Sequence, residues 1–290
     1  MKVSYYPGCS LEGTAKSYDL SARAVCGELG IALHEIPEWS CCGSSPALKM
    51  NRLLSVALSA HTMAQVAKQQ LEDVVAPCPF CFRRLRGAQD ELTRDPALKE
   101  QVERTIGQPI HVGLRISSLL EYMRDHVPVE TLQEKLARPL KGLKVIPFYG
   151  CYLVKPPRVT RFDDPENPTS LDELLSALGA EVLDWDFKAE CCGAGLALAK
   201  TEKVCELSGR LIREAEYRGA DAIVVACQLC QANLDMRQGD IGLLDGSHHE
   251  MPILYFTQLM GLSFGRQPTE LGLHTHLVDP LAMLANKGLI

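Results

Sequence analysis

The feature that most constrains this chain is a pattern of five cysteines that occurs twice. In each copy a single cysteine is followed by two adjacent cysteines with a glycine directly after them, and then by a CxxC pair. The copies comprise Cys9, Cys41, Cys42, Cys78 and Cys81, and then Cys151, Cys191, Cys192, Cys227 and Cys230. The single cysteine and the vicinal pair are separated by 31 and 39 residues, and the glycine and the CxxC pair by 34 and 33. The sequence therefore predicts a duplicated domain.

The segments around the cysteines predict an α/β fold in each copy. Short β-branched runs precede both CxxC pairs, as buried strands do, and each half opens with an apolar strand that ends in cysteine. Strands are expected at 2–6, 73–76, 110–112, 144–148, 222–226 and 253–255. Helices are expected at 15–29, 47–70, 171–178 and 195–218, the third with a capping box formed by Ser170 and Glu173.

This alternation favours two pseudo-symmetric Rossmann-like β-α-β repeats, each a parallel sheet flanked by helices. We expect the domains to span residues 1–142 and 143–290. Because the carboxyl ends of parallel strands share one edge, the cysteines of a copy should converge there, beside helix N-termini that favour an anionic group.

Five cysteines per copy exceed the four ligands of a zinc ion or of an ordinary cubane or rhombic cluster. Both thiolates of a vicinal pair can point into one metal site, and an extra thiolate can bridge two irons. The pattern therefore indicates an iron–sulfur site of unusual shape in each half. The alternatives are structural zinc in one or both halves, a thioredoxin-like CxxC redox pair, and a zinc-bearing scaffold without catalysis.

Composition narrows the function classes. The formal charge is −6, from 30 basic and 36 acidic residues, which argues against nucleic-acid binding and against a polybasic membrane patch. No signal-like or membrane-spanning apolar stretch is seen, so we expect a cytoplasmic protein without direct membrane insertion. In such a reducing compartment, 12 cysteines indicate metal binding or redox chemistry rather than disulfides.

Four residues outside the ten repeat cysteines need separate interpretation. Cys26 and Cys205 have no counterpart in the other half and are expected to be core residues. Lys155 and Arg158 follow Cys151 in a proline-rich segment, where they are candidates for gripping an anionic substrate, although a solvated loop would carry the same residues.

The doubled cysteine, CCG and CxxC pattern resembles the CCG-domain family, and the chain resembles the B subunit of heterodisulfide reductase over nearly its whole length. The resemblance implies one noncubane [4Fe-4S] cluster on Cys9, Cys41, Cys42, Cys78 and Cys81. It implies a second on Cys151, Cys191, Cys192, Cys227 and Cys230. In this family a small disulfide or thiol substrate binds between the two clusters and is reduced, or formed in the reverse direction, by two electrons.

The resemblance also implies two partners within a heterodisulfide-reductase-type complex, namely a small ferredoxin-like subunit that delivers electrons to this chain and a flavin-bearing subunit that feeds it. The segments 4–9 and 162–165 look more like the bacterial relatives of the family. A second hypothesis within the same architecture is an electron-transfer subunit of an organic-acid or quinone-linked oxidoreductase.

Overall fold

A computed structural model describes residues 1–44 and 46–290. It contains two four-stranded sheets in which all neighbouring strands are parallel. The first sheet has the order β2-β1-β3-β4, with strands β1 (Lys2–Tyr5), β2 (Ala32–Glu35), β3 (Asp73–Ala76) and β4 (Arg115–Ser118). The second has the same order, β6-β5-β7-β8, with strands β5 (Lys144–Phe148), β6 (Glu181–Val182), β7 (Ala222–Val225) and β8 (Ile253–Tyr255). The predicted α/β fold with two repeats is confirmed.

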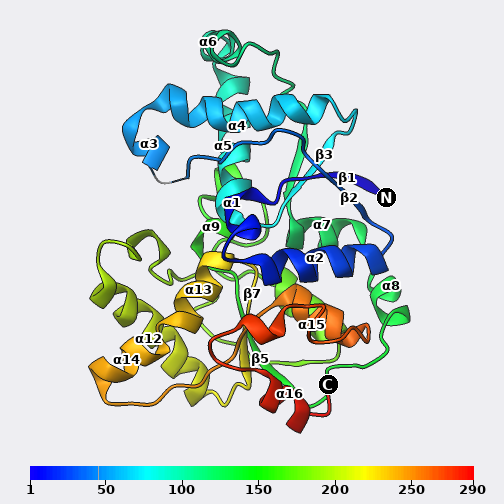
Figure 1. The fold of residues 1–290 in the computed structure, drawn as a ribbon, viewed down its shortest axis with the longest axis vertical. Coiled ribbons are helices and arrows are strands. Elements are labelled where there is room, and N and C mark those ends of the chain that lie inside the picture. The colour runs from blue at the N-terminus through cyan, green and yellow to red at the C-terminus, as the bar shows by residue number, and fades with distance from the viewer. Residues whose placement is uncertain (45) are drawn as a thin grey trace.

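Helices connect the strands and cover the sheets (Figure 1). The first half contains α1 (Gly8–Glu12), α2 (Lys16–Glu28), α3 (Pro46–Met50), α4 (Arg52–Ala67), α5 (Pro79–Arg94), α6 (Pro96–Ile106), α7 (Leu119–His126) and α8 (Val129–Glu134). The second half contains α9 (Cys151–Val154), α10 (Pro157–Thr160), α11 (Ser170–Ala177), η1 (Ala194–Leu196), α12 (Thr201–Tyr217), α13 (Gln228–Met236), α14 (Gln238–Asp245), α15 (Phe256–Ser263), η2 (Leu273–Thr275) and α16 (Leu281–Asn286). Among the described residues, no helix combines the length and the apolar character needed to cross a membrane.

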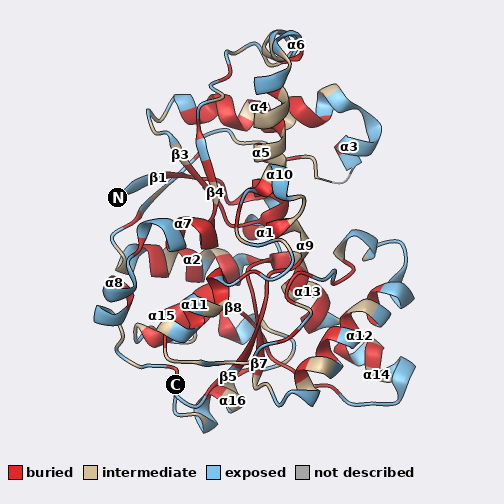
Figure 2. Ribbon diagram, turned by 180° about the vertical axis from the view of Figure 1, so that it is seen from behind, coloured by how far each residue is buried: buried red, intermediate tan, exposed pale blue. Residues whose placement is uncertain are grey.

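The central strands β3 and β7 are apolar because helices cover them on both faces. All four residues of β7 are fully buried, and Val74 to Ala76 of β3 are at most 1% exposed. Figure 2 shows buried residues along the strands and on the inward faces of the helices. The buried apolar side chains of the two halves form one continuous cluster, so neither sheet packs in isolation.

The two halves pack through pairs of helices that exchange roles. Helix α2 of the first half contacts α15 of the second, while α11, the equivalent of α2, contacts α7, the equivalent of α15. Figure 1 shows α2 lying along α15. In that contact Tyr18 stacks on Tyr255 with ring centroids 4.3 Å apart, and the hydroxyls of Ser21 and Thr257 lie 2.7 Å apart. This exchange is what an approximate twofold relation between the repeats requires.

The predicted strand at 110–112 is wrong, because the fourth strand of the first sheet is β4. Ile110 is buried all the same, and its backbone N–H donates to the Glu103 carboxylate at 2.9 Å. The strand begins only after Gly113, where Arg115 to Ser118 can pair with β3. The short apolar run at 110–112 was thus predicted to be a strand, whereas the Ile110 backbone N–H bonds to the side chain of Glu103 on α6.

The predicted capping box at Ser170 and Glu173 is also wrong. Helix α11 already includes Ser170, and the hydroxyl of the preceding Thr169 bonds to the Glu173 carboxylate at 2.8 Å. A capping box does occur at α7, where Ser118 accepts from the Glu121 N–H and the Glu121 carboxylate accepts from the Ser118 N–H.

The contact between α2 and α15 predicts a large stability effect at one residue. Replacing Tyr18 with alanine should lower the free energy of unfolding by about 3–5 kcal/mol, because it leaves a cavity between the halves. Tyr18→Phe should cost ~1 kcal/mol at most, because it keeps the ring stack and removes only a 3.3 Å hydrogen bond to the Ala226 carbonyl. Anaerobic urea unfolding measures the free energy of unfolding of both variants. Equal losses of stability would contradict the large contribution expected from the stacked ring of Tyr18.

Candidate metal centre

Each half begins its cysteine site with a glycine at the carboxyl end of a strand. Gly8 has a φ of +70° and Gly150 a φ of +67°, a conformation that L side chains rarely adopt. A Cβ atom at Gly8 would lie 2.8 Å from Cys81 Sγ, and one at Gly150 would lie 2.9 Å from Cys230 Sγ. The missing side chain therefore lets the strand end approach the CxxC pair of its own half.

In the first half, three chain segments bring their thiols to the carboxyl edge of the sheet. Cys78 is the N-cap of α5, and its sulfur accepts the Cys81 backbone N–H at 3.4 Å. The sulfur of Cys81 lies 3.5 Å from that of Cys42, and the sulfur of Cys9 lies 3.9 Å from that of Cys41. We call this group the first rim.

The second half repeats the arrangement in what we call the second rim. Cys227 is the N-cap of α13, and Cys230 follows in its first turn. The Cys230 sulfur lies 3.3 Å from that of Cys192, and all five cysteines of this half line one small cavity. The expected convergence of the segments at one edge of each sheet is therefore observed in both halves.

In each rim a hydrogen bond between two thiols shifts their pKa values in opposite directions. The bond between Cys81 and Cys42 lowers the pKa of Cys42 to about 7 and raises the pKa of Cys81. A hydrogen bond from Cys151, together with the Gly193 N–H, lowers the pKa of Cys191 to about 6. Each rim therefore stabilises thiolates, the form of cysteine that binds metals.

The two rims meet each other. The side-chain amide of Gln228, which lies inside the second CxxC pair, donates to Cys78 Sγ of the first rim at 2.8 Å. Phe80, which lies inside the first CxxC pair, stacks on Tyr152, the neighbour of Cys151, with centroids 4.0 Å apart and planes at 12°. The duplication thus places the two rims side by side, linked by residues from within the motifs.

These linking residues were not singled out by the sequence. Gln228, Phe80 and Tyr152 lie inside or next to the cysteine motifs at positions that the motif pattern does not specify, and that placement was the available signal. Asn233 was also missed: its amide donates to the Cys192 carbonyl at 3.1 Å and holds the loop of the second vicinal pair. All four supply contacts that depend on tertiary packing rather than on a pattern.

The donor set fits a thiolate-bound iron–sulfur group. Each rim gathers five cysteines, and N–H groups of Cys81, Gly193 and Gln228 donate to cysteine sulfurs, as donors around such clusters do. Within residues 1–44 and 46–290, no three His, Cys, Asp or Glu side chains form a group that could hold a metal ion by themselves.

The four candidate residues outside the repeat cysteines lie in different surroundings. Cys26 and Cys205 are buried among apolar side chains, and burial raises the pKa of Cys26 to about 12, so their expected place in the core is confirmed. Lys155 forms an ion pair with Glu166 of its own loop at 3.2 Å. Arg158 instead lines a cavity of about 520 Å³ that Tyr152 also borders.

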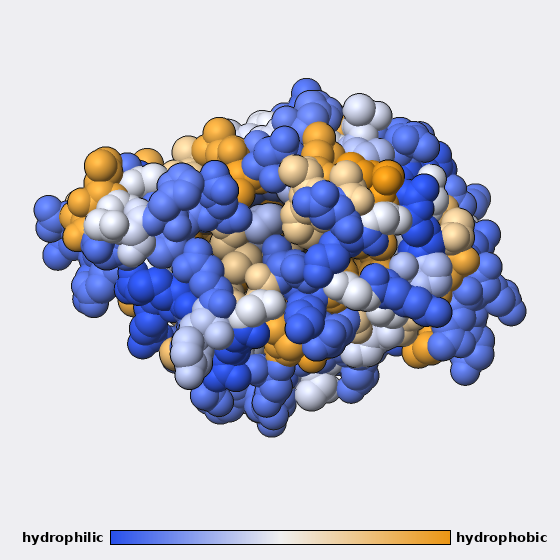
Figure 3. Space-filling model, turned by 90° about the horizontal axis from the view of Figure 1, so that it is seen from below, coloured by the Kyte–Doolittle hydropathy of each residue, from blue (hydrophilic) through white to orange (hydrophobic). Residues whose placement is uncertain are grey.

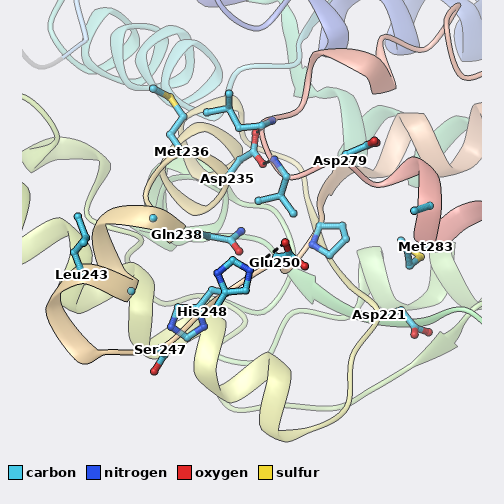
Figure 4. Close-up of a pocket in the computed structure, with 17 residues that line it drawn as sticks. Asp221, Asp235, Met236, Gln238, Leu243, Ser247, His248, Glu250, Asp279 and Met283 are labelled. Carbon is cyan, nitrogen blue, oxygen red and sulfur yellow. Dashed lines mark hydrogen bonds and ion pairs between the residues drawn. The ribbon is translucent and has the colours of Figure 1, made fainter.

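A larger cavity of about 990 Å³ lies away from the rims, between α13, α14 and the C-terminal segment (Figure 4). None of the ten repeat cysteines lines it. Asp235, one of its acidic residues, accepts the backbone N–H groups of Leu277 and Val278 at 2.9 and 3.0 Å. Its acidic groups therefore serve partly to fix the C-terminal segment.

Seen from below, the molecule is mainly hydrophilic with scattered apolar side chains (Figure 3).

Comparison with known proteins agrees with this duplicated site. Residues 3–86 and 145–235 match the CCG family, described as a cysteine-rich domain, and together they make up more than half of the chain. The chain belongs to the CCG cysteine-rich domain family. The two matched segments contain all ten repeat cysteines, one set of five in each.

Curated relatives of this CCG protein match it over nearly its whole length. It is 33% identical to the 8-methylmenaquinol:fumarate reductase membrane anchor subunit of Wolinella succinogenes, over 96% of this chain and 97% of that protein. It is 28% identical to the B subunit of the ferredoxin:CoB-CoM heterodisulfide reductase of Methanosarcina mazei, over 98% and 96%. It is also 28% identical to a protein of Archaeoglobus profundus described as like the B subunit of heterodisulfide reductase, over 92% of each chain.

A solved structure supports the fold of the CCG protein. The crystal structure of a hypothetical protein from Helicobacter pylori superimposes with a TM-score of 0.77 over 96% of this chain and 52% of that one. Its sequence is 13% identical, so the similarity concerns the fold alone.

The glycine next to each rim yields a prediction with a matched control. Gly8→Ala should destabilise the protein by about 2–4 kcal/mol, because backbone strain adds to a collision with Cys81 Sγ. Gly30→Ala should cost about 1 kcal/mol, since Gly30 has nearly the same φ, +68°, with no atom within 4 Å of the added Cβ. Anaerobic thermal unfolding compares the two, and equal losses would show that sulfur packing does not constrain Gly8.

Proposed function

We propose that this chain is the iron–sulfur catalytic subunit of a heterodisulfide-reductase-type complex, in which it exchanges two electrons with a small disulfide or thiol. The observation that carries the proposal is the contact between two five-cysteine rims, made through Gln228 and Cys78. Relatives named as the B subunit of heterodisulfide reductase support an oxidoreductase subunit of this type.

Each rim would hold one [4Fe-4S] cluster of noncubane shape. The proposed ligands of the first are Cys9, Cys41, Cys42, Cys78 and Cys81, and those of the second are Cys151, Cys191, Cys192, Cys227 and Cys230. When bound, the two clusters would supply one-electron chemistry each, which matches a disulfide that takes two electrons and two protons to become two thiols.

The residues of this chain prepare the site in three ways. The N-termini of α5 and α13 point their positive ends toward the rims and stabilise negative charge there. The Gln228 amide links the two rims, and the ring of Phe80 stacks on that of Tyr152 across the contact between the halves. We assign the two rims to domains 1–142 and 143–290.

The proposal includes partners, because electrons must enter or leave the subunit. The relatives named as heterodisulfide reductase subunits imply a complex of several subunits. We infer that one partner is flavin-bearing and that the other is ferredoxin-like. The ferredoxin-like partner would dock within electron-transfer distance of one rim.

A second candidate is an electron-transfer subunit of a quinone-linked organic-acid oxidoreductase. It is favoured by the 33% identity to a protein whose name describes a menaquinol:fumarate reductase subunit. In that function the same two rims would relay electrons, and no disulfide would react.

Metal and sulfide analysis tests the cofactor assignment. Protein purified anaerobically should contain about eight iron and about eight acid-labile sulfide atoms per chain, as two four-iron clusters would supply. Cys41→Ser and Cys192→Ser should each lose roughly half of both, because each removes a thiolate from one rim, while Cys26→Ala should keep them, because Cys26 is a core residue. A colourless protein with one or two zinc ions would support the scaffold alternative instead.

The reaction itself separates the two candidates. The chemically reduced complex should reduce a small disulfide under anaerobic conditions, and iodoacetamide treatment should leave that activity intact as long as iron content is unchanged, since no free thiol takes part. Loss of activity with full iron content would indicate thiol exchange. A complex that oxidises a menaquinol analogue with fumarate but reduces no disulfide would favour the second candidate.

A further inference from the structure

The cavity of about 520 Å³ that Arg158 lines is rich in positive charge. It lies between α4 and α5 of the first half and α9 and α10 of the second, two parts of the chain that contact each other. Its basic residues are Lys49, Arg52, Arg83, Arg84, Arg94 and Arg158, and its acidic residues are Asp90, Glu91 and Asp95. Six cations thus face three carboxylates, although the whole chain carries a net charge of −6.

The three carboxylates are already engaged. Glu91 pairs with Arg52 at 2.9 Å, Asp90 pairs with Arg94 at 3.0 Å, and Asp95 caps α6. Among residues 1–44 and 46–290, no carboxylate lies within ion-pair distance of Lys49, Arg83 or Arg158. The cavity therefore has cationic side chains without a carboxylate partner among the described residues, and these could bind an anionic ligand.

Arg84 adds a fixed positive charge to this wall. Its guanidinium donates to the Ser55 carbonyl at 2.7 Å, which holds the side chain against α4. Its Nε is buried and has no hydrogen-bond partner among the described residues. Because this Nε atom is inaccessible to solvent, Arg84 contributes to the cavity through the positive charge of its guanidinium group rather than through that donor.

None of the ten repeat cysteines lines this cavity, but it shares Tyr152 and Gly195 with a small cavity that all five cysteines of the second rim line. Ser44 and Gly195, which follow the first and second vicinal cysteine pairs, both line the cavity of about 520 Å³. Tyr152, the neighbour of Cys151, also lines it, and its ring lies between Phe80 at 4.0 Å and the Arg83 guanidinium at 4.3 Å. A molecule in this cavity would reach the cysteines of the second rim past one aromatic ring.

We propose that this cavity binds an anionic end, a carboxylate, sulfonate or phosphate, of the substrate that reacts at the rims, and that Arg83 and Arg158 hold it. This inference rests on the proposed function, whose substrate class it names. Guanidinium groups suit such anions because they donate paired hydrogen bonds in one plane. Lys155 has no part in it, because Lys155 pairs with Glu166 and does not line the cavity.

Binding of a ligand that cannot be reduced tests the site without any turnover. The assembled complex should bind the dianionic thioether 3,3′-thiodipropionate in calorimetry, more tightly than the neutral 2,2′-thiodiethanol, and more weakly as salt increases. Arg83→Gln and Arg158→Gln should each raise the Kd about tenfold, since each removes a charge-assisted hydrogen bond.

Arg104→Gln is the matched control, because Arg104 is exposed, pairs with Glu100 on α6 and does not line the cavity. It should leave the Kd unchanged. Equal binding of the two thioethers, or a Kd that neither cavity variant alters while circular dichroism shows native folding, would overturn the proposal.

Turnover then separates this proposal from the proposed function. With the reduced complex, Arg83→Gln should raise the KM for 3,3′-dithiodipropionate about tenfold, leave kcat near its original value and leave the KM for neutral bis(2-hydroxyethyl) disulfide unchanged. Reduction of both disulfides with the same KM in every variant would overturn the anion site and keep the disulfide function. Arginine-dependent thioether binding without any disulfide reduction would keep the anion site and overturn the disulfide function.

Discussion

The structure depends on the close approach of a strand end to a cysteine sulfur, which only glycine permits. Gly8 and Gly150 combine a left-handed backbone with a sulfur atom less than 3 Å from where a Cβ would stand. The first cysteine of each half follows directly, so its position is set by the same turn. The CxxC pair, the vicinal pair and the single cysteine can meet only because this approach is possible. The parallel order of the strands supplies the common edge at which they meet.

Packing of the halves extends this local arrangement to a site with two rims. Helix α2 packs on α15, and helix α11 packs on α7. In both contacts the second helix follows the last strand of the opposite half. That exchange turns the two carboxyl edges toward each other, and it brings the Gln228 amide to Cys78 and the Phe80 ring to Tyr152. The partner of each linking residue thus lies in the opposite half, so a site of this kind cannot form in one repeat alone.

The symmetry is not complete, and the differences bear on function. An amide lies inside one CxxC pair and an aromatic ring inside the other, so the rims have different surroundings. The basic cavity lies where α5 of the first half faces α9 and α10 of the second. A substrate with one charged end would therefore bind in one orientation, and its two sulfur atoms would meet unequal environments. The duplicated chain keeps the paired cysteine-bearing edges and differs in the residues around them.

The sequence by itself determined the duplication, the α/β fold and the cysteines that converge in each half, because these follow from spacing and from strand-length apolar runs that do not depend on distant contacts. It placed the strands at 73–76, 222–226 and 253–255 close to where they lie. It failed for 110–112 and for the Ser170 capping box, where the backbone groups bond to Glu103 and to the segment before α11. Tertiary structure alone decided the contact between the rims and the choice of Arg158 over Lys155 as a cavity residue. Those outcomes depend on which side chains from separate halves come within a few ångströms of each other, and no local pattern in the chain encodes that distance.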